Sequence, residues 1–198
     1  MIHSPVDKSL IVFLGNEGFS WYIEGCSENI HALLQGRPIQ EYIFHPTERN
    51  WGLASAYTLC EDFVGEPCKI YKELFVTKDL GNNWTQIGKY VVQFSWGVVD
   101  KSQIAQGVPK ERIILTYDPR GKGDQKNEGW SYKIDCVYSD DFFRTAKVLV
   151  SKGNKFLLTK DYLFIAEVMD VESQEVLLLV SKSNPLYLHP LSHAFISL

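Results

Sequence analysis

The order of apolar and polar residues along the chain is that of a β-protein. Most segments alternate apolar with polar residues, or run in β-branched and aromatic residues, between clusters of turn-forming residues. This pattern predicts strands at 9–14, 19–24, 39–44, 51–58, 69–77, 84–88, 90–97, 111–117, 131–139, 146–151, 155–160, 162–170 and 175–181. The segment 27–36, with apolar Ile30, Leu33 and Leu34 before Gly36, is typical of a short helix or helical loop. Because the strands do not alternate with helices, we expect an all-β sandwich, barrel or propeller.

A short residue pattern, here called the frame, recurs between predicted strands. Its repetition distinguishes a propeller from a sandwich or a barrel. It is clearest as Thr77-x-Asp79-x-Gly81-x-Asn83-Trp84. Further copies are Leu14-x-Asn16-x-Gly18-x-Ser20-Trp21, a looser Ser139-x-Asp141-x-Phe143-x-Thr145-Ala146 and a nearly erased Ser181-x-Ser183. Four-stranded units of roughly 40–60 residues with a signature at the same place are typical of propeller blades.

The chemistry of the frame is that of a tight turn. Asp79 can accept hydrogen bonds from backbone N–H groups that a bend leaves unpaired. Gly81 supplies a positive φ, and Trp84 can bury its ring against a neighbouring unit. A catalytic acid at Asp79 would need a second titratable group beside it, and the sequence offers none. We therefore expect the residues of the frame to be structural.

Composition and charge narrow the class of protein. The 198 residues are 45% hydrophobic and 22% charged, with a net charge of −4, which argues against a protein that binds nucleic acid or anionic lipid. The basic run at 118–126 contains Gly and acids, so a solvated loop is expected. No segment approaches the roughly 18–20 apolar residues of a membrane span. The apolar stretch Leu10–Leu14 is too short for a signal peptide.

The four cysteines contain no CxxC pair, so a zinc knuckle or a thioredoxin-type motif is not expected. They are Cys26, Cys60, Cys68 and Cys136. Cys60 and Cys68 bracket the turn-rich EDFVGEP, a spacing that suits a small disulfide-closed hairpin loop in an oxidising compartment. The alternative is two free thiols in a cytosolic protein.

Five sequence blocks lie in and around the copies of the frame: YIFHPTERNWGLASA (42–56), ELFVTKDLGNNWTQI (73–87), YVVQFSWG (90–97), CVYSDDFFRT (136–145) and YLFIAEV (162–168). The frame itself resembles the Asp-box of sialidases and many other propellers. The blocks, taken together in this order over about residues 39–181, resemble the sortilin family of receptors, whose luminal domain is a ten-bladed propeller.

The resemblance implies a partial propeller of about three and a half four-stranded blades with Asp-box turns. Its units would be about 1–38, 39–89, 90–152 and 153–181, followed by an irregular tail at 182–198. Thr77, Asp79, Gly81 and Trp84 would close a blade, and Cys60 and Cys68 match a small intra-blade disulfide. The same Asp-box role is expected of Asn16, Gly18, Trp21, Ser139 and Asp141.

The resemblance also implies a function. A sortilin-type receptor has no enzymatic activity and binds soluble proteins or peptides in the lumen of the Golgi and endosomes, for delivery to a lysosome or vacuole. No cofactor, metal or nucleic acid is implied. The chain is expected to be a fragment of a longer receptor, which would reach the membrane only through a transmembrane segment outside these residues.

Other candidate sites carry weaker signals. Asn83-Trp84-Thr85 is a sequon, which makes Asn83 a candidate glycosylation site. His189 and His193 are spaced like metal ligands on a helix, but Pro190 lies between them. A sialidase-like glycosidase would need three arginines that grip a carboxylate, and the five arginines (Arg37, Arg49, Arg112, Arg120 and Arg144) lack that signature. A soluble propeller scaffold, or a carbohydrate-binding one, is the further alternative.

Overall fold

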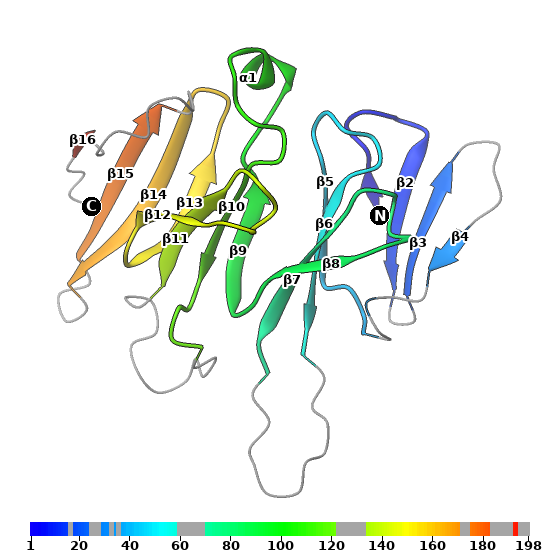
Figure 1. Cartoon of the computed structure of the whole chain (residues 1–198), viewed down its shortest axis with the longest axis horizontal. Helices are drawn as coiled ribbons and strands as arrows, with labels where there is room; N and C mark the ends of the chain where they lie inside the picture. The colour runs from blue at the N-terminus through cyan, green and yellow to red at the C-terminus, as the bar shows by residue number, and fades with distance from the viewer. Residues whose placement is uncertain are drawn as a thin grey trace, which may run out of the picture. The chain divides into compact units, whose positions relative to one another are not determined.

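The computed structural model divides the chain into two compact units, Met1–Lys89 and Tyr90–Leu198. The residues that it describes are 1–15, 18–23, 29–31, 34, 37–58, 70–121, 134–170, 175–182 and 192–193. Within these residues each unit contains two four-stranded antiparallel sheets, and each sheet is a meander of consecutive strands (Figure 1). A four-stranded meander is the building block of a propeller blade.

The first unit consists of the sheets β1-β2-β3-β4 and β5-β6-β7-β8. The first sheet comprises β1 (Ile2–His3), β2 (Leu10–Gly15), β3 (Gly18–Ile23) and β4 (Asn29–His31). The second sheet comprises β5 (Glu41–Phe44), β6 (Gly52–Tyr57), β7 (Lys72–Thr77) and β8 (Thr85–Gly88).

The two sheets of the first unit share one hydrophobic core. Leu10 and Val12 of β2, and Ala54 and Ala56 of β6, are fully buried in it. Since side chains alternate along a strand, one face of β2 and one face of β6 enter the same core. The core is completed by Leu34, Ile39, Tyr42, Phe44, Phe75 and Leu80.

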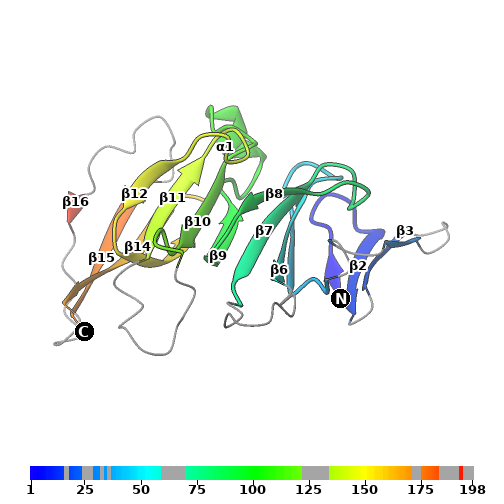
Figure 2. The same ribbon diagram turned by 60° about the horizontal axis from the view of Figure 1, so that its bottom comes forward.

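The second unit consists of the sheets β9-β10-β11-β12 and β13-β14-β15-β16. The first comprises β9 (Val91–Trp96), β10 (Ile113–Tyr117), β11 (Asp135–Ser139) and β12 (Lys147–Val150). The second comprises β13 (Gly153–Leu158), β14 (Tyr162–Asp170), β15 (Glu175–Lys182) and β16 (Ser192–His193). The short helix α1 (Lys101–Ala105) lies in the connection from β9 to β10 (Figure 2).

A hydrophobic core and two glutamines hold the sheets of the second unit together. The core contains Ile114, Cys136, Val150, Phe156, Leu163 and Ile165. The Gln93 side chain donates to the carbonyl of Phe156 (2.8 Å) and accepts its N–H (3.0 Å), as a neighbouring strand would. The buried Gln103 of α1 donates to the carbonyl of Lys160 (2.8 Å). The helix is thereby tied to the turn between β13 and β14.

The repeat is visible in the sheets β5–β8 and β9–β12, whose third and fourth strands pair in the same register. Leu74 pairs with Gly88 and Val76 with Thr85, and the register shifts between Leu74 and Phe75. The pairs Cys136–Val150 and Tyr138–Lys147, and the shift after Cys136, are the same with every number higher by 62. The fold is therefore an internal repeat of one four-stranded unit.

The expected all-β partial propeller is confirmed, and three local expectations change. The tail at 182–198 contains β16, whose residues pair with Leu179 and Val180 and so complete a fourth four-stranded sheet. Within 27–36, residues 29–31 form β4, which pairs with β3, and Leu34 has 3₁₀-helical backbone; the other residues of this segment lie outside the described residues. Sequence analysis missed α1, although Asp100 caps its first N–H groups and Gly107 follows it with φ 97°.

Candidate functional site

The connection between β7 and β8 is a compact turn built around one hydroxyl and one carboxylate. The Thr77 hydroxyl donates to Oδ1 of Asp79 (2.8 Å) and accepts the backbone N–H groups of Asp79 (3.3 Å) and Gly81 (2.8 Å). Oδ1 of Asp79 accepts the backbone N–H of Asn83 (2.8 Å), and Oδ2 accepts its side-chain amide (2.6 Å). Thr77 is 2% exposed. Its hydroxyl thus satisfies N–H groups that the turn would otherwise bury unpaired.

The connection between β11 and β12 repeats this arrangement atom for atom. The Ser139 hydroxyl donates to Oδ1 of Asp141 (2.7 Å) and accepts the N–H groups of Asp141 (3.1 Å) and Phe143 (2.8 Å). Asp141 accepts the N–H (2.9 Å) and the hydroxyl (2.7 Å) of Thr145. The looser frame in the sequence therefore forms the same turn.

Both turns contain two consecutive residues with left-handed backbone. In the first turn these are Leu80 (φ 59°) and Gly81 (φ 88°). In the second they are Phe142 (φ 58°) and Phe143 (φ 62°). A Phe in this conformation costs about 1 kcal/mol more than Gly. The hydrogen bonds to the hydroxyl and carboxylate therefore impose the turn even where glycine is absent.

The tryptophan of the frame connects the first turn to the core of its unit. Trp84 packs against that core and meets the Tyr42 ring edge-on, with 6.4 Å between the ring centroids. At the matching position of the second turn, Ala146 is exposed. The ring contact is therefore a feature of one turn and not a requirement of the hydrogen-bonded frame.

The two carboxylates are held in their ionised form. Partial burial opposes ionisation of Asp79, but hydrogen bonds from Asn83 and Thr77 outweigh it and lower its pKa. Hydrogen bonds from Thr145 and Ser139 lower the pKa of Asp141 to about 2. A general acid needs a pKa near the pH at which it works. These environments suit a structural carboxylate.

The candidate glycosylation site lies inside the first turn. Asn83 is exposed, but its side-chain nitrogen, the atom that would carry a glycan, donates to Asp79 at 2.6 Å. Modification would have to replace or rearrange this hydrogen bond. Glycosylation of Asn83 stays a prediction.

The frame at 14–21 occupies a different place in its sheet. Gly15 pairs with Gly18, so the hairpin leaves two residues between β2 and β3. It joins the second and third strands, whereas the turns at Thr77 and Ser139 join the third and fourth. Asn16 lies outside the described residues, and Gly18 and Trp21 belong to β3. The residue types of the frame do not by themselves show which two strands it connects. Of the fourth copy, Ser181 is in β15 and Ser183 lies outside the described residues.

Each of the turns at Thr77 and Ser139 is supported by a contact from a neighbouring residue that precedes the second strand of its sheet. In the second turn Arg112 makes two hydrogen bonds to Asp140 (2.6 and 2.9 Å) and lies over the Tyr138 ring. At the corresponding positions of the first turn, the Lys78 ammonium lies 5.5 Å from the centre of the Trp51 ring. The support is kept while its chemistry changes from ion pair to cation–π contact.

A second repeated turn, which sequence analysis missed, connects the first two strands of each sheet in the first unit. The Ser4 hydroxyl accepts the N–H groups of Val6 and Asp7, both at 3.2 Å. Nδ1 of the buried His45 accepts the corresponding N–H groups of Thr47 (3.1 Å) and Glu48 (2.9 Å). The signal was present in the sequence as SPVD (4–7) and HPTE (45–48).

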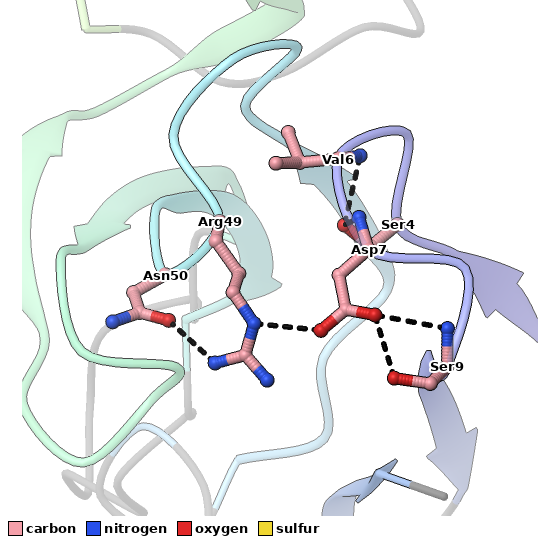
Figure 3. Close-up of polar contacts among 6 residues, drawn as sticks. All are labelled: Ser4, Val6, Asp7, Ser9, Arg49 and Asn50. Carbon is pink, nitrogen blue, oxygen red and sulfur yellow. Dashed lines mark hydrogen bonds and ion pairs between the residues drawn. The ribbon is translucent and has the colours of Figure 1, made fainter.

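One ion pair joins these two turns (Figure 3). Oδ1 of Asp7 accepts the N–H (3.0 Å) and hydroxyl (2.6 Å) of Ser9, and Oδ2 accepts Nε of Arg49 (2.7 Å). The pKa of Asp7 is lowered by these hydrogen bonds, first that of the Ser9 hydroxyl. The carbonyl of Asn50 accepts the N–H of Leu80 (3.0 Å). The turn at Thr77 is thereby connected with both loops.

The predicted disulfide lies outside the described residues, which include neither Cys60 nor Cys68. The strands that lead to them meet at Thr58 and Tyr71, where the N–H of Thr58 donates to the carbonyl of Tyr71 (3.0 Å). Cys136 is buried with a free thiol, and burial, with a smaller effect of Asp135, raises its pKa to about 12. Cys26 lies outside the described residues.

Four of the five arginines form ion pairs with four different acids. Arg37 pairs with Glu73, and both side chains are buried. The other pairs are Arg49–Asp7, Arg112–Asp140 and Arg120–Asp118. A glycosidase that grips a carboxylate needs convergent arginines. Here each of the four paired guanidiniums has an acid of its own, so these arginines do not converge on one anion.

The expectations about metal binding and membrane spans can be compared with the structure only in the described residues. Among the described residues, no group of three or more His, Cys, Asp or Glu side chains is arranged to hold a metal ion. His189 lies outside these residues, and of His193 only its place in β16 is described. No helix in the described parts of the chain has the length and apolar character of a membrane span.

Comparison with known proteins confirms the resemblance found in the sequence. A family model described as "Sortilin, neurotensin receptor 3" matches residues 1–187. The vacuolar protein sorting/targeting protein 10 of Pyricularia oryzae is 24% identical over 167 residues, which cover 80% of this chain and 10% of that protein. The chain thus spans about a tenth of the length of this curated relative.

A solved structure supports the fold. The crystal structure of an ancestral GH74 enzyme matches 98% of this chain and 25% of its own, with a TM-score of 0.53 and 13% identity. At that identity the likeness concerns the fold alone. The match to the family model covers nearly the whole chain, and so this protein belongs to the Sortilin-Vps10 family, a receptor family.

Proposed function

We propose that this chain is a non-enzymatic, ligand-binding segment of a sortilin-type sorting receptor. Its ligands are soluble proteins or peptides that the receptor binds in the lumen of the Golgi and endosomes for delivery to a lysosome or vacuole. A transmembrane segment outside residues 1–198 anchors it. The observation that carries this proposal is the family match over residues 1–187. The net charge of −4 supports a protein ligand over nucleic acid.

The site chemistry supports a binding role over catalysis. The candidate acids Asp79 and Asp141 have lowered pKa values and are surrounded by hydroxyl and amide donors. Three of the arginines, Arg37, Arg49 and Arg112, each pair with a different acid and so do not converge on one carboxylate as a sialidase-like enzyme would need. These groups stabilise a scaffold, which leaves the loops that the sheets carry for recognition.

We further propose that Cys60 and Cys68 form a disulfide in the β6–β7 connection. A receptor lumen is oxidising, whereas a cytosolic propeller scaffold would keep both thiols reduced. Peptide mapping without reduction, on protein purified from its native cell with free thiols blocked, separates the two. The receptor proposal predicts a linked 60–68 peptide pair. Two blocked thiols would favour the scaffold.

The function itself is tested by deleting the gene and assaying the medium for soluble vacuolar or lysosomal hydrolases. The proposal predicts that one or more hydrolases are secreted, and that the re-expressed full-length gene returns them to the organelle. Crosslinking in the rescued cells should capture the same hydrolase on the receptor. Normal sorting of every hydrolase, with no captured cargo, would contradict the proposal.

A further inference from the structure

His45, the residue that follows β5, is a buried titratable group whose ring holds the β5–β6 connection in its turn. The residue is 0% exposed. Its Nδ1 accepts the backbone N–H groups of Thr47 (3.1 Å) and Glu48 (2.9 Å). Because a backbone N–H can only donate, Nδ1 must offer its lone pair to both. The closed turn therefore requires a neutral ring with its hydrogen on Nε2.

The turn that His45 stabilises is connected to two other loops of the first unit. Arg49 extends from it to Asp7 in the β1–β2 connection, with 2.7 Å between Nε and Oδ2 (Figure 3). The carbonyl of Asn50 accepts the N–H of Leu80 in the β7–β8 turn (3.0 Å). A change in the backbone of this turn would therefore reach both neighbouring loops.

The charged groups around the ring cannot replace its two hydrogen bonds. The Trp51 ring meets the His45 ring edge-on, with 5.3 Å between the centroids, and the Lys78 ammonium lies 5.5 Å from the centre of the Trp51 ring. A proton on His45 would thus add a second cation beside this tryptophan. The acids of the surrounding loops are Glu48 and Asp7, and Asp7 already forms an ion pair. Attraction to an acid favours the new charge but restores no acceptor, because the proton occupies the lone pair of Nδ1.

We propose that the β5–β6 turn is a pH-sensitive element, which opens when His45 takes up a proton at Nδ1 and releases the N–H groups of Thr47 and Glu48. A histidine in water takes up this proton near pH 6.5, whereas the closed turn cannot do so without losing both hydrogen bonds. The open turn therefore binds more protons, and the closed turn becomes less stable as the pH falls below about 6.5. This response needs only the turn itself and does not rest on the proposed function.

The β1–β2 connection forms the same turn without a titratable group at its centre. There the Ser4 hydroxyl accepts the N–H groups of Val6 and Asp7, both at 3.2 Å. A serine hydroxyl keeps its lone pairs over the whole range in which histidine titrates. We therefore expect these two hydrogen bonds to persist at a pH at which the His45 turn opens, which makes them a control within the same molecule.

The test is amide hydrogen exchange in the full chain, followed by NMR at about pH 7.5 and about pH 5.5 and corrected for the intrinsic effect of pH. Uptake of one proton predicts that protection of Thr47 and Glu48 falls about tenfold, while that of Val6 and Asp7 stays unchanged. His45→Asn offers an amide oxygen, an acceptor that does not titrate, and should abolish this pH dependence. Unchanged protection of Thr47 and Glu48 in the wild type would overturn the proposal. So would the same tenfold loss in His45→Asn, because another group would then be responsible.

The ring nitrogens give a readout that needs no variant. NMR spectra that correlate the ring hydrogens of His45 with its nitrogens should show Nε2 protonated and Nδ1 unprotonated at neutral pH. On acidification Nδ1 should gain its proton at the pH at which Thr47 and Glu48 lose protection. A proton on Nδ1 at neutral pH would overturn the proposal, whether or not His45→Asn folds.

Discussion

The β7–β8 and β11–β12 hairpins have the same pattern of hydrogen bonds, although the aspartate is the only residue of the frame that both of them share. Thr77 and Asp79 correspond to Ser139 and Asp141, with distances that agree within a few tenths of an ångström. Gly81, however, corresponds to Phe143. Since the backbone is left-handed in both, the hydroxyl and the carboxylate define the turn, and glycine only lowers its cost.

The second difference concerns the connection to the core. Trp84 packs against the core of its unit, while Ala146 is exposed at the matching position. The supporting contact also differs, as a Lys78–Trp51 cation–π contact in one turn and an Arg112–Asp140 ion pair in the other. The hydrogen-bonded frame is therefore constant, and its attachment to the sheet varies.

The largest expected effect comes from removing the attachment of the first turn. Trp84→Ala deletes a half-buried ring that packs against the core and should lower the free energy of unfolding by about 2–4 kcal/mol. The reciprocal change Ala146→Trp should alter it by less than about 0.5 kcal/mol, because that position is exposed. Urea unfolding followed by circular dichroism measures both. Equal effects would mean that the tryptophan has no special role in the first turn.

Removing the hydroxyl should affect both turns alike. Thr77→Val and Ser139→Ala each leave two backbone N–H groups without their acceptor, and each should cost about 1–3 kcal/mol. Thr85→Val, at an exposed position of β8, is the control and should change stability by less than about 0.5 kcal/mol. If one variant is as stable as the wild type, the two turns do not depend on the same hydrogen bonds.

Substitutions at the two left-handed positions should change the free energy of unfolding in opposite directions. Gly81→Ala introduces a Cβ at φ 88° and should destabilise by about 1 kcal/mol. Phe143→Gly relieves the same strain at φ 62°, and a gain of up to about 1 kcal/mol is expected, reduced by the loss of the half-buried ring. Midpoints of urea unfolding decide the sign. A strong loss for Phe143→Gly would show that the ring contributes more than the backbone strain.

The smallest effect concerns pH. The pKa values of Asp79 and Asp141 are lowered in the folded protein, that of Asp141 to about 2. The unfolded state therefore binds protons first, and the stability that these groups contribute is lost as pH falls below about 4. Between neutral pH and pH 5 both carboxylates stay ionised. Asp141→Asn should remove part of the acid sensitivity, and carboxyl NMR titration should locate the folded pKa near 2; a value near 4 would contradict the hydrogen bonding.

Much of the fold was predictable, because strand and core positions follow from the two-residue alternation seen in Leu10 and Val12, or Ala54 and Ala56. The turns were predictable only where the hydroxyl and the carboxylate form the hydrogen bonds of the frame. A match in residue types alone was not sufficient. The match at Leu14–Trp21 contains the right residue types between the wrong pair of strands, and topology is not visible in a local pattern. The looser copy at Ser139–Ala146 was recognised although Phe143 stands at the position of Gly81, and it forms the same turn because that turn tolerates a non-glycine residue with left-handed backbone.

Contacts between residues far apart in the sequence could not be predicted. Arg37 and Glu73, Arg49 and Asp7, or Gln93 and Phe156 are far apart in sequence, and each pair forms only when two sheets or loops are in place. The Ser4 and His45 turns were within reach, since both precede a proline and have an acid three residues on. They were missed because a serine and a histidine perform the same role with different atoms.

Amide hydrogen exchange at Gly81 and Phe143, followed by NMR, tests most directly that one hydrogen-bonded frame builds both turns. These two N–H groups donate to the hydroxyls of Thr77 and Ser139 at 2.8 Å. Both should exchange slowly in the wild type, and each should become fast only in its own hydroxyl variant, Thr77→Val or Ser139→Ala. Fast exchange at Phe143 in the wild type would contradict the account and leave the turn at Thr77 as the one turn of this kind in the described part of the chain.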